Sequence, residues 1–127
     1  MKIFVDGQHG AAGVCLIEKL QLLAQTYNID FISIADSKSE VERYNAIREA
    51  DIAVLCLPEE ISAKTCADLN EVDTVIIDAS TYHRTLLGWT YGFLELNKQQ
   101  IKEIVNSKRI ANPGCFAGGI MSLLTPI

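Results

Sequence analysis

No apolar run in the sequence approaches the ~20 residues that a membrane-spanning helix needs. The N-terminus reaches an acid already at Asp6, which is too early for the apolar core of a secretory signal peptide. Cations are in the minority, because 11 Lys+Arg stand against 16 Asp+Glu and leave a net charge of −5. A binder of nucleic-acid phosphates needs Lys and Arg clustered on one face. These absences predict a cytoplasmic protein that binds neither membranes nor nucleic acid.

Cysteines are few, and no two of them form a C-x-x-C pair. Cys15, Cys56, Cys66 and Cys115 are unevenly spaced, which predicts neither a metal site nor a disulfide framework. We expect reduced thiols, the first three of them small buried side chains. Internal repeats, low-complexity tracts and linkers are missing as well. The whole chain, residues 1–127, is therefore expected to form one domain with a single core.

The sequence does contain an alternation of short apolar runs and helical periodicities. Apolar residues recur three and four positions apart between residues 14 and 24, as in a helix. The run at 52–57 is continuously apolar, as expected of a strand buried on both faces of a parallel sheet. This rhythm predicts an α/β fold of the doubly wound (Rossmann) type, with a mostly parallel sheet and helices on both faces. The predicted strands are 3–5, 31–34, 52–57 and 74–77, and the predicted helices are 14–24, 37–49 and 59–69.

Periodicity disappears between residues 78 and 96, and this segment is predicted to be a long functional loop. Asn97 is the expected N-cap of the next helix, which ends near Ser107. A short strand at 109–111, a tight turn at 112–115 and a helix at 116–124 follow. The expected buried stripe of the 97–107 helix is Ile101, Ile104 and Val105.

Glycines occupy every third position between the first strand and the first helix, at Gly7, Gly10 and Gly13. A dinucleotide-binding loop needs a tight turn, a backbone open to a pyrophosphate, and close packing of helix on strand. The spacing G-x-x-G-x-x-G departs from the commoner G-x-G-x-x-G, so glycines that merely turn the chain are the alternative. The predicted cofactor-binding residues of this loop are the three glycines with Ala11 and Ala12.

The end of the second strand leaves the choice between NAD and NADP open. Asp36 lies where an acid would bind the ribose hydroxyls of NAD. Ser37 and Lys38 follow at once and can hold the 2′-phosphate of NADP instead. Ser37 can equally be the N-cap of the following helix.

Cys115 follows the turn Asn112-Pro113-Gly114 and precedes an apolar helix. Its sulfur is expected at a helix N-terminus, where unpaired amides and the helix dipole favour a thiolate nucleophile. A nucleophilic cysteine beside a nicotinamide implies hydride exchange with a thiohemiacetal or thioester.

The chain contains two histidines that such chemistry could recruit. His9 is expected to contact backbone or phosphate, and His83 to anchor its loop by hydrogen bonding. Arg84 is the expected anion binder, since its fork suits carboxylate or phosphate, with a structural salt bridge as the alternative.

Four segments of the sequence together resemble short-type N-acetyl-gamma-glutamyl-phosphate reductases of arginine biosynthesis. They are residues 7–13, 77–85, 88–96 and 112–115, and the resemblance extends over essentially the whole chain. Leu94 stands where the family commonly has proline, and Phe116-Ala117 where it has Tyr-Pro or a similar pair.

The resemblance implies an NADP(H)-dependent reductive dephosphorylation of a small-molecule substrate. Cys115 would attack the acyl phosphate of N-acetyl-glutamyl 5-phosphate and release phosphate, and NADPH would reduce the thioester to the semialdehyde. The segment of Ser37 and Lys38 maps near the adenosine phosphate, which favours NADP. Ser80, Arg84 and Asn112 are expected near the substrate or its phosphate.

Family members are much longer than this chain, so we expect it to be an incomplete part. The missing portion would supply the substrate domain, and the 127-residue chain alone is expected to be inactive. Apolar surface left exposed would favour a homo-oligomer. The alternative is a non-catalytic NADP-binding or redox-sensing module. A signalling receiver is disfavoured because the third strand ends at Cys56-Leu57-Pro58 without an acid.

Overall fold

The computed structural model describes residues 1–124, and its strands form one six-stranded sheet. The strand order is β2-β1-β3-β4-β6-β5, and every neighbouring pair is parallel. The strands are β1 (Lys2–Asp6), β2 (Asp30–Ile32), β3 (Ile52–Leu55), β4 (Val75–Asp78), β5 (Thr90–Tyr91) and β6 (Arg109–Ala111). The helices are α1 (Ala11–Ala24), α2 (Glu40–Glu49), α3 (Glu59–Asp68), the 3-10 turn η1 (Leu94–Leu96), α4 (Lys98–Asn106) and α5 (Cys115–Leu124).

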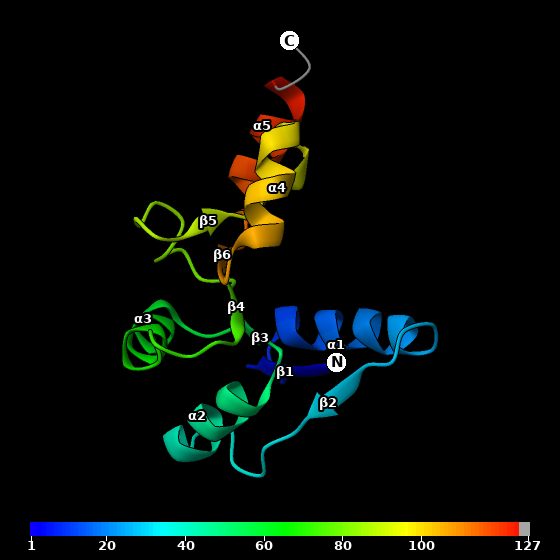
Figure 1. Ribbon diagram of the computed structural model, residues 1–127, viewed down its shortest axis with the longest axis vertical. Helices are drawn as coiled ribbons and strands as arrows, with labels where there is room; N and C mark the ends of the chain where they lie inside the picture. The colour runs from blue at the N-terminus through cyan, green and yellow to red at the C-terminus, as the bar shows by residue number, and fades with distance from the viewer. Residues whose placement is uncertain (125–127) are drawn as a thin grey trace.

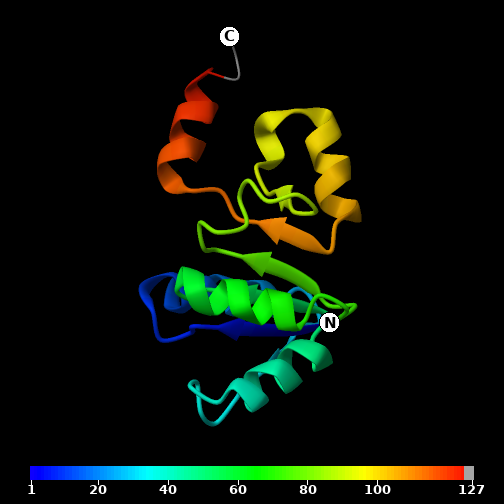
Figure 2. The ribbon, with the colours of Figure 1, turned by 90° about the vertical axis from the view of Figure 1, so that its left-hand side faces the viewer.

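The chain moves outward from β1 in two directions, to β2 on one side and to β3 and β4 on the other. Right-handed crossovers in opposite directions put helices on opposite faces of the sheet. Figures 1 and 2 show α1 on one face and α3 on the other. The doubly wound fold is therefore confirmed, with its reversal of strand order between β1 and β3. Ligands of such folds bind at the carboxyl ends of the strands near this reversal.

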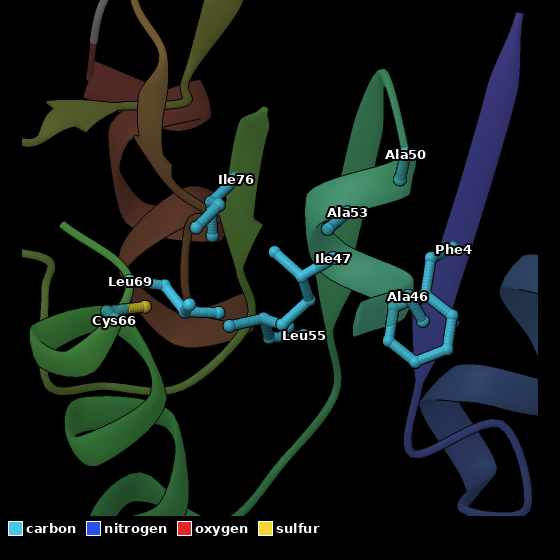
Figure 3. Packing of buried hydrophobic residues seen from close by; sticks show 9 residues of the cluster. All are labelled: Phe4, Ala46, Ile47, Ala50, Ala53, Leu55, Cys66, Leu69 and Ile76. Atoms are coloured by element: carbon cyan, nitrogen blue, oxygen red, sulfur yellow. The ribbon is translucent and has the colours of Figure 1, made fainter. Parts of the chain in front are cut away.

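The main apolar core lies between the sheet and the helices α2 and α3, which cover the same face of it (Figure 3). Ala53 and Leu55 of β3 point into it, while Ile52 and Val54 on the alternate positions are only half-buried. The expectation that this strand is buried on both faces is thus wrong for the α1 face. The core consists of Phe4, Ala46, Ile47, Ala50, Ala53, Leu55, Cys66, Leu69 and Ile76.

The buried stripe predicted for α4 is also wrong. Ile101 is 45% exposed and Val105 76% exposed, and only Ile104 is half-buried. Gln100 is buried instead, and its side-chain amide donates to the carbonyl of Tyr91 in β5. The cause is β5, a strand inside the segment that was expected to be a loop. Helix α4 packs beside this strand. Asn97 caps α4 as predicted, by accepting from the Gln100 amide.

The N-cap of α2 is Ser39, whose hydroxyl accepts from the Glu42 amide. Ser37 therefore does not cap this helix, contrary to that alternative. Within residues 1–124, no helix combines the length and apolarity needed to span a membrane.

Candidate functional site

Two of the three glycines are required by packing inside the chain. Gly7 has a φ of +75°, and a Cβ there would lie far inside van der Waals contact of the Cys56 carbonyl oxygen. A Cβ on Gly13 would collide in the same way with the Gly7 carbonyl oxygen. The loop is thereby pressed against the end of β3 on one side and against α1 on the other.

Gly10 is different, because nothing in the described chain demands glycine there. A Cβ at Gly10 would meet only the Gly7 carbonyl oxygen, at 3.4 Å, and the backbone φ is an ordinary −79°. Gly10 is the exposed N-cap of α1, and no side chain caps this helix. The first amides of α1, with Ala11 and Ala12 as small exposed neighbours, are open to an anion.

A cavity of about 610 Å³ lies beside this loop. Ser37 and Lys38 line it together with Gly7 and Gly10, whereas Asp36 does not. The Asp36 carboxylate instead accepts from the Lys38 amide at 2.9 Å, within its own turn. The geometry therefore brings Ser37 and Lys38, rather than Asp36, to the cavity. The lining is Asp6, Gly7, His9, Gly10, Ser37, Lys38, Glu40, Arg43, Leu57, Glu60, Ile61, Lys64 and Thr65.

A buried ion pair that no sequence motif announced supports this cavity. The Arg43 guanidinium donates to the Asp6 carboxylate at the end of β1, and both side chains are more than nine-tenths buried. A second nitrogen of Arg43 donates to the Ser37 carbonyl at 2.9 Å. Arg43 therefore ties the 37–38 segment to the glycine loop, since Asp6 also accepts from the Gly7 amide.

A second cavity, of about 330 Å³, lies on the α1 face of the sheet. Ala12 at the start of α1 and Asn112 of the cysteine turn both line it, with side chains of β3 and β4. The glycine loop and the cysteine turn, a hundred positions apart in the sequence, thus border one mainly apolar space. The remaining lining residues are Leu16, Val54, Cys56, Ile77 and Ala79.

Asp78, the last residue of β4, has a fully buried carboxylate that contacts side chains of α3 and of the following loop. Ser62 and Ser80 donate through their hydroxyls at 2.5 and 2.6 Å, and the Ser80 amide donates at 3.0 Å. His83 Nδ1 lies 2.5 Å from Oδ2 of Asp78, the oxygen that also accepts from the Ser80 hydroxyl. Burial alone would raise the pKa of Asp78, but the bonds from His83, Ser62 and Ser80 outweigh it and hold the pKa below its ordinary value.

His83 has the anchoring role expected of it. Its ring is buried, stacks on Trp89 with centroids 3.8 Å apart, and meets the edge of Tyr82. Ser80 is buried as well, and its hydroxyl serves Asp78 and the Tyr82 amide. Sequence inspection singled out Ser80 without Asp78, although an acid at the carboxyl end of a buried strand was the available signal.

Arg84 links this loop to the cysteine turn. Its guanidinium donates to the carbonyls of Asn112 at 3.1 Å and Ala79 at 3.3 Å. A Cβ on Gly114 would come within 2.7 Å of the guanidinium, so glycine permits the close approach. The partners of Arg84 are carbonyls, not the carboxylate that a salt bridge requires.

Cys115 is the first residue of α5 and is exposed. The Gly114 carbonyl begins the helix by accepting from the Gly118 amide at 2.8 Å. Asp78 and Asn112 are joined directly, because the Asn112 amide donates to the Asp78 carbonyl at 2.8 Å. The Cys115 turn is therefore fixed to β4 and to Arg84, while its thiol stays accessible.

The other cysteines divide by burial. Cys66 is buried, which together with the charge of Asp78 raises the pKa of its thiol to about 12, so it is inert at neutral pH. Cys56 is half-buried, and its pKa is raised by burial and by Asp6 and Asp78. Cys15 is exposed, which corrects the expectation of a buried side chain. The described residues contain no cluster of ligands suited to a metal ion.

The sheet order, the glycine loop and the cavity at the strand ends define a nucleotide-binding α/β domain. Residues 25–104 match the family described as semialdehyde dehydrogenase, NAD binding domain, and the chain belongs to this family.

Curated relatives of the chain are named N-acetyl-gamma-glutamyl-phosphate reductases. The chain is 41% identical to an N-acetyl-gamma-glutamyl-phosphate reductase of Mesorhizobium japonicum and 39% identical to one of a Chelativorans species. Each alignment covers 99% of this chain, but 41% and 40% of the relative. The chain therefore spans about two fifths of the length of these relatives.

Solved structures agree on the fold. Aspartate semialdehyde dehydrogenase II of Vibrio cholerae superposes with a TM-score of 0.76 at 24% identity, over 98% of this chain and 46% of that one. The aspartate semialdehyde dehydrogenase of Francisella tularensis gives 0.68 at 19% identity, over 90% and 36%.

Proposed function

We propose that this chain is the NADP-binding part of an N-acetyl-gamma-glutamyl-phosphate reductase. The observation that carries the proposal is that Ala12, at the start of α1, and Asn112, in the turn before the exposed Cys115, line one cavity. The names of the curated relatives support the substrate. In this proposal residues 1–127 form the nucleotide domain, and the substrate domain lies outside them.

The proposed cofactor site extends along the first cavity. The amides at the start of α1, beside Gly7, Gly10 and Gly13, would hold the pyrophosphate. Ser37 and Lys38 would hold the 2′-phosphate of NADP, since both line the cavity. The family description names NAD, so the choice of NADP rests on these two side chains.

The proposed reaction begins at Cys115. Its Sγ attacks the acyl carbon of N-acetyl-glutamyl 5-phosphate, the carbon–oxygen bond breaks, and phosphate leaves, which produces a thioester on the enzyme. When bound, NADPH supplies the hydride that reduces the acyl group to the semialdehyde, and the thiolate leaves. Arg84 has two donors on backbone carbonyls, and its remaining N–H groups would bind the departing phosphate.

Asn112 and Ser80 have less freedom for the substrate roles that their segments suggest. Asn112 is exposed, and its side-chain amide donates to the Pro113 carbonyl at 3.3 Å, with a second N–H free to meet substrate. Ser80 is buried on Asp78. In the proposal Ser80 therefore acts by holding the loop that carries Arg84.

The test is a pair of measurements on the purified chain. Fluorescence titration is expected to detect NADPH binding that survives Cys115→Ser. Phosphate-dependent reduction of NADP with N-acetyl-glutamate semialdehyde is expected to give no turnover with this chain and turnover with a full-length relative. Absence of NADPH binding would contradict the cofactor assignment. Turnover by the wild-type chain that disappears in Cys115→Ser would contradict the proposal that residues 1–127 alone lack a complete catalytic site.

A second candidate is a non-catalytic NADP-binding or redox-sensing module, favoured by the exposure of the Cys115 thiol. It predicts NADP affinity that survives Cys115→Ser and no turnover at any protein concentration.

We also propose that the chain forms a homo-oligomer, because Phe116 and Leu123 of α5 are 80% and 76% exposed. Sedimentation at rising concentration checks this.

A further inference from the structure

The cavity beside the glycine loop carries a balanced set of charges. Among the described residues that line it, Asp6, Glu40 and Glu60 are acids, and Lys38, Arg43 and Lys64 are bases. A phosphate group that enters would meet repulsion from every acid that lacks a cationic partner. The ion pairs of the wall therefore decide how well the cavity tolerates an anion.

Two of the three acids have a partner. Asp6 is neutralised by the buried Arg43. Glu40, the first residue of α2, accepts from Lys64 of α3 at 2.6 Å. Glu40 lies within a few positions of Ser37 and Lys38, the side chains proposed to hold the 2′-phosphate.

Lys64 is held at this position by more than Glu40. Its ammonium lies 3.2 Å from the Asp68 carboxylate and 3.4 Å from the Tyr44 hydroxyl. The bonds to Glu40 and then Asp68 raise the pKa of Lys64, so the cation persists throughout the neutral range. Lys64 of α3 thereby keeps a positive charge on the wall of the cavity that Ser37 and Lys38 also line.

We propose that Lys64 is a specificity-determining residue that favours NADP over NAD, by neutralising Glu40 beside the 2′-phosphate position. This inference rests on the proposed function, because it concerns the same cofactor cavity. Lys38 would contact the phosphate, and Lys64 would cancel the acid that otherwise repels it. The β2–α2 loop alone, where sequence inspection placed the choice, is then only half of the determinant.

The experiment compares NADPH and NADH dissociation constants of the full chain at low salt, by fluorescence titration. Lys64→Gln is expected to weaken NADPH binding about fivefold, since one unscreened charge contact in water is of that order. NADH binding is expected to change less than about twofold, because NADH lacks the phosphate that Glu40 repels. The difference should shrink at high salt.

Two further variants separate neutralisation from mere structural support. Glu40→Gln in the Lys64→Gln background is expected to restore NADPH affinity, since the repelling acid is gone. Lys108→Gln is the matched control, because Lys108 also pairs with an acid, Asp73, and is exposed to 53% against 55% for Lys64, but does not line the cavity. It should leave both constants unchanged.

An unchanged NADPH/NADH ratio in Lys64→Gln would overturn the inference. Equal weakening of both cofactors would overturn it too, because Lys64 would then be only a tie between α2 and α3. Failure of the wild-type chain to bind NADPH in preference to NADH would contradict the proposed cofactor itself. Thermal unfolding of each variant confirms that the fold is intact.

Discussion

The buried carboxylate of Asp78 fixes the loop after β4 through several hydrogen bonds, although the sequence analysis did not propose this residue for the site. Four donor contacts converge on its buried carboxylate, from Ser62, from Ser80 twice and from His83. Its backbone carbonyl also receives the Asn112 amide. One residue at the end of β4 therefore orders both the loop after it and the turn before Cys115.

Asp78→Asn is expected to cost about 3 kcal/mol of unfolding free energy at neutral pH, the scale for breaking a buried charged network. The pKa of Asp78 is lower in the folded chain than its ordinary 3.8. Its stabilisation is therefore fully present above pH 3.8 and lost as the pH falls from there through the folded value. Urea unfolding between pH 3 and 7 measures this. A gap between wild type and variant that stays constant down to pH 3 would refute the assignment.

The glycines permit a sharper comparison at single positions. Gly13→Ala is expected to destabilise the chain by about 2 kcal/mol, because the new Cβ collides with backbone that cannot move aside. Gly10→Ala is expected to change stability by less than about 1 kcal/mol, since its Cβ meets one oxygen at 3.4 Å.

The effect of Gly10→Ala should fall on cofactor affinity rather than on stability. Gly10→Ala is expected to weaken NADPH affinity about tenfold while the unfolding midpoint barely moves, because the methyl group occupies the approach to the α1 amides. Urea unfolding measures the stability of each variant, and NADPH titration of the same preparations measures its cofactor affinity. Unchanged affinity in Gly10→Ala would mean that all three glycines serve packing alone.

At the scale of elements, Arg109 joins β6 to the connection between α3 and β4. Its two terminal nitrogens donate at 2.9 to 3.2 Å to five carbonyls. A planar guanidinium offers five N–H donors on three nitrogens, whereas an ammonium offers three donors on a single nitrogen and cannot reach as many separated acceptors. The acceptors are the carbonyls of Leu69, Asn70, Val72, Thr74 and Lys108.

Arg109→Lys is accordingly expected to lower the unfolding free energy by about 1–2 kcal/mol. Arg48→Lys, on the exposed last turn of α2, is the matched control and should change it by less than about 0.5 kcal/mol. Urea unfolding measures both. Equal effects of the two substitutions would show that the carbonyl contacts of Arg109 contribute nothing.

The elements also show which parts of the molecule the sequence could predict. Periodicity located the helices and the first four strands, because their patterns depend on local repeats. It could not locate β5, a strand of two residues whose pairing with β6 is a long-range event. Without β5, the side of α4 that meets the sheet was assigned to Ile101 and Val105 rather than to Gln100.

The candidate site residues divide by the same rule. Gly7, Gly13 and Cys115 could be proposed from the sequence, because their neighbours define a loop and a helix start. Arg43 and Lys64 could not, since their roles arise from partners 37 and 24 positions away.

At the scale of the whole molecule, the proposed cofactor binding would be coupled to folding. The cavity is lined from the loop after β1, the segment before α2, and α3, which come together only in the folded chain. A ligand that binds the folded state alone at 100 times its dissociation constant adds about 2.7 kcal/mol of stability. For a chain of this size that corresponds to a rise of roughly 10 °C in the thermal midpoint.

NADPH is therefore expected to raise the melting temperature by that amount, and NADH at the same concentration by clearly less, because only NADPH engages Ser37 and Lys38. Scanning calorimetry with each cofactor measures the shift, and Cys115→Ser serves as a control that should respond like wild type, since Cys115 does not line this cavity. Equal shifts with both cofactors would remove the case for a 2′-phosphate site. No shift with either would mean that the glycine loop and its cavity, although assembled, do not hold a dinucleotide in this chain.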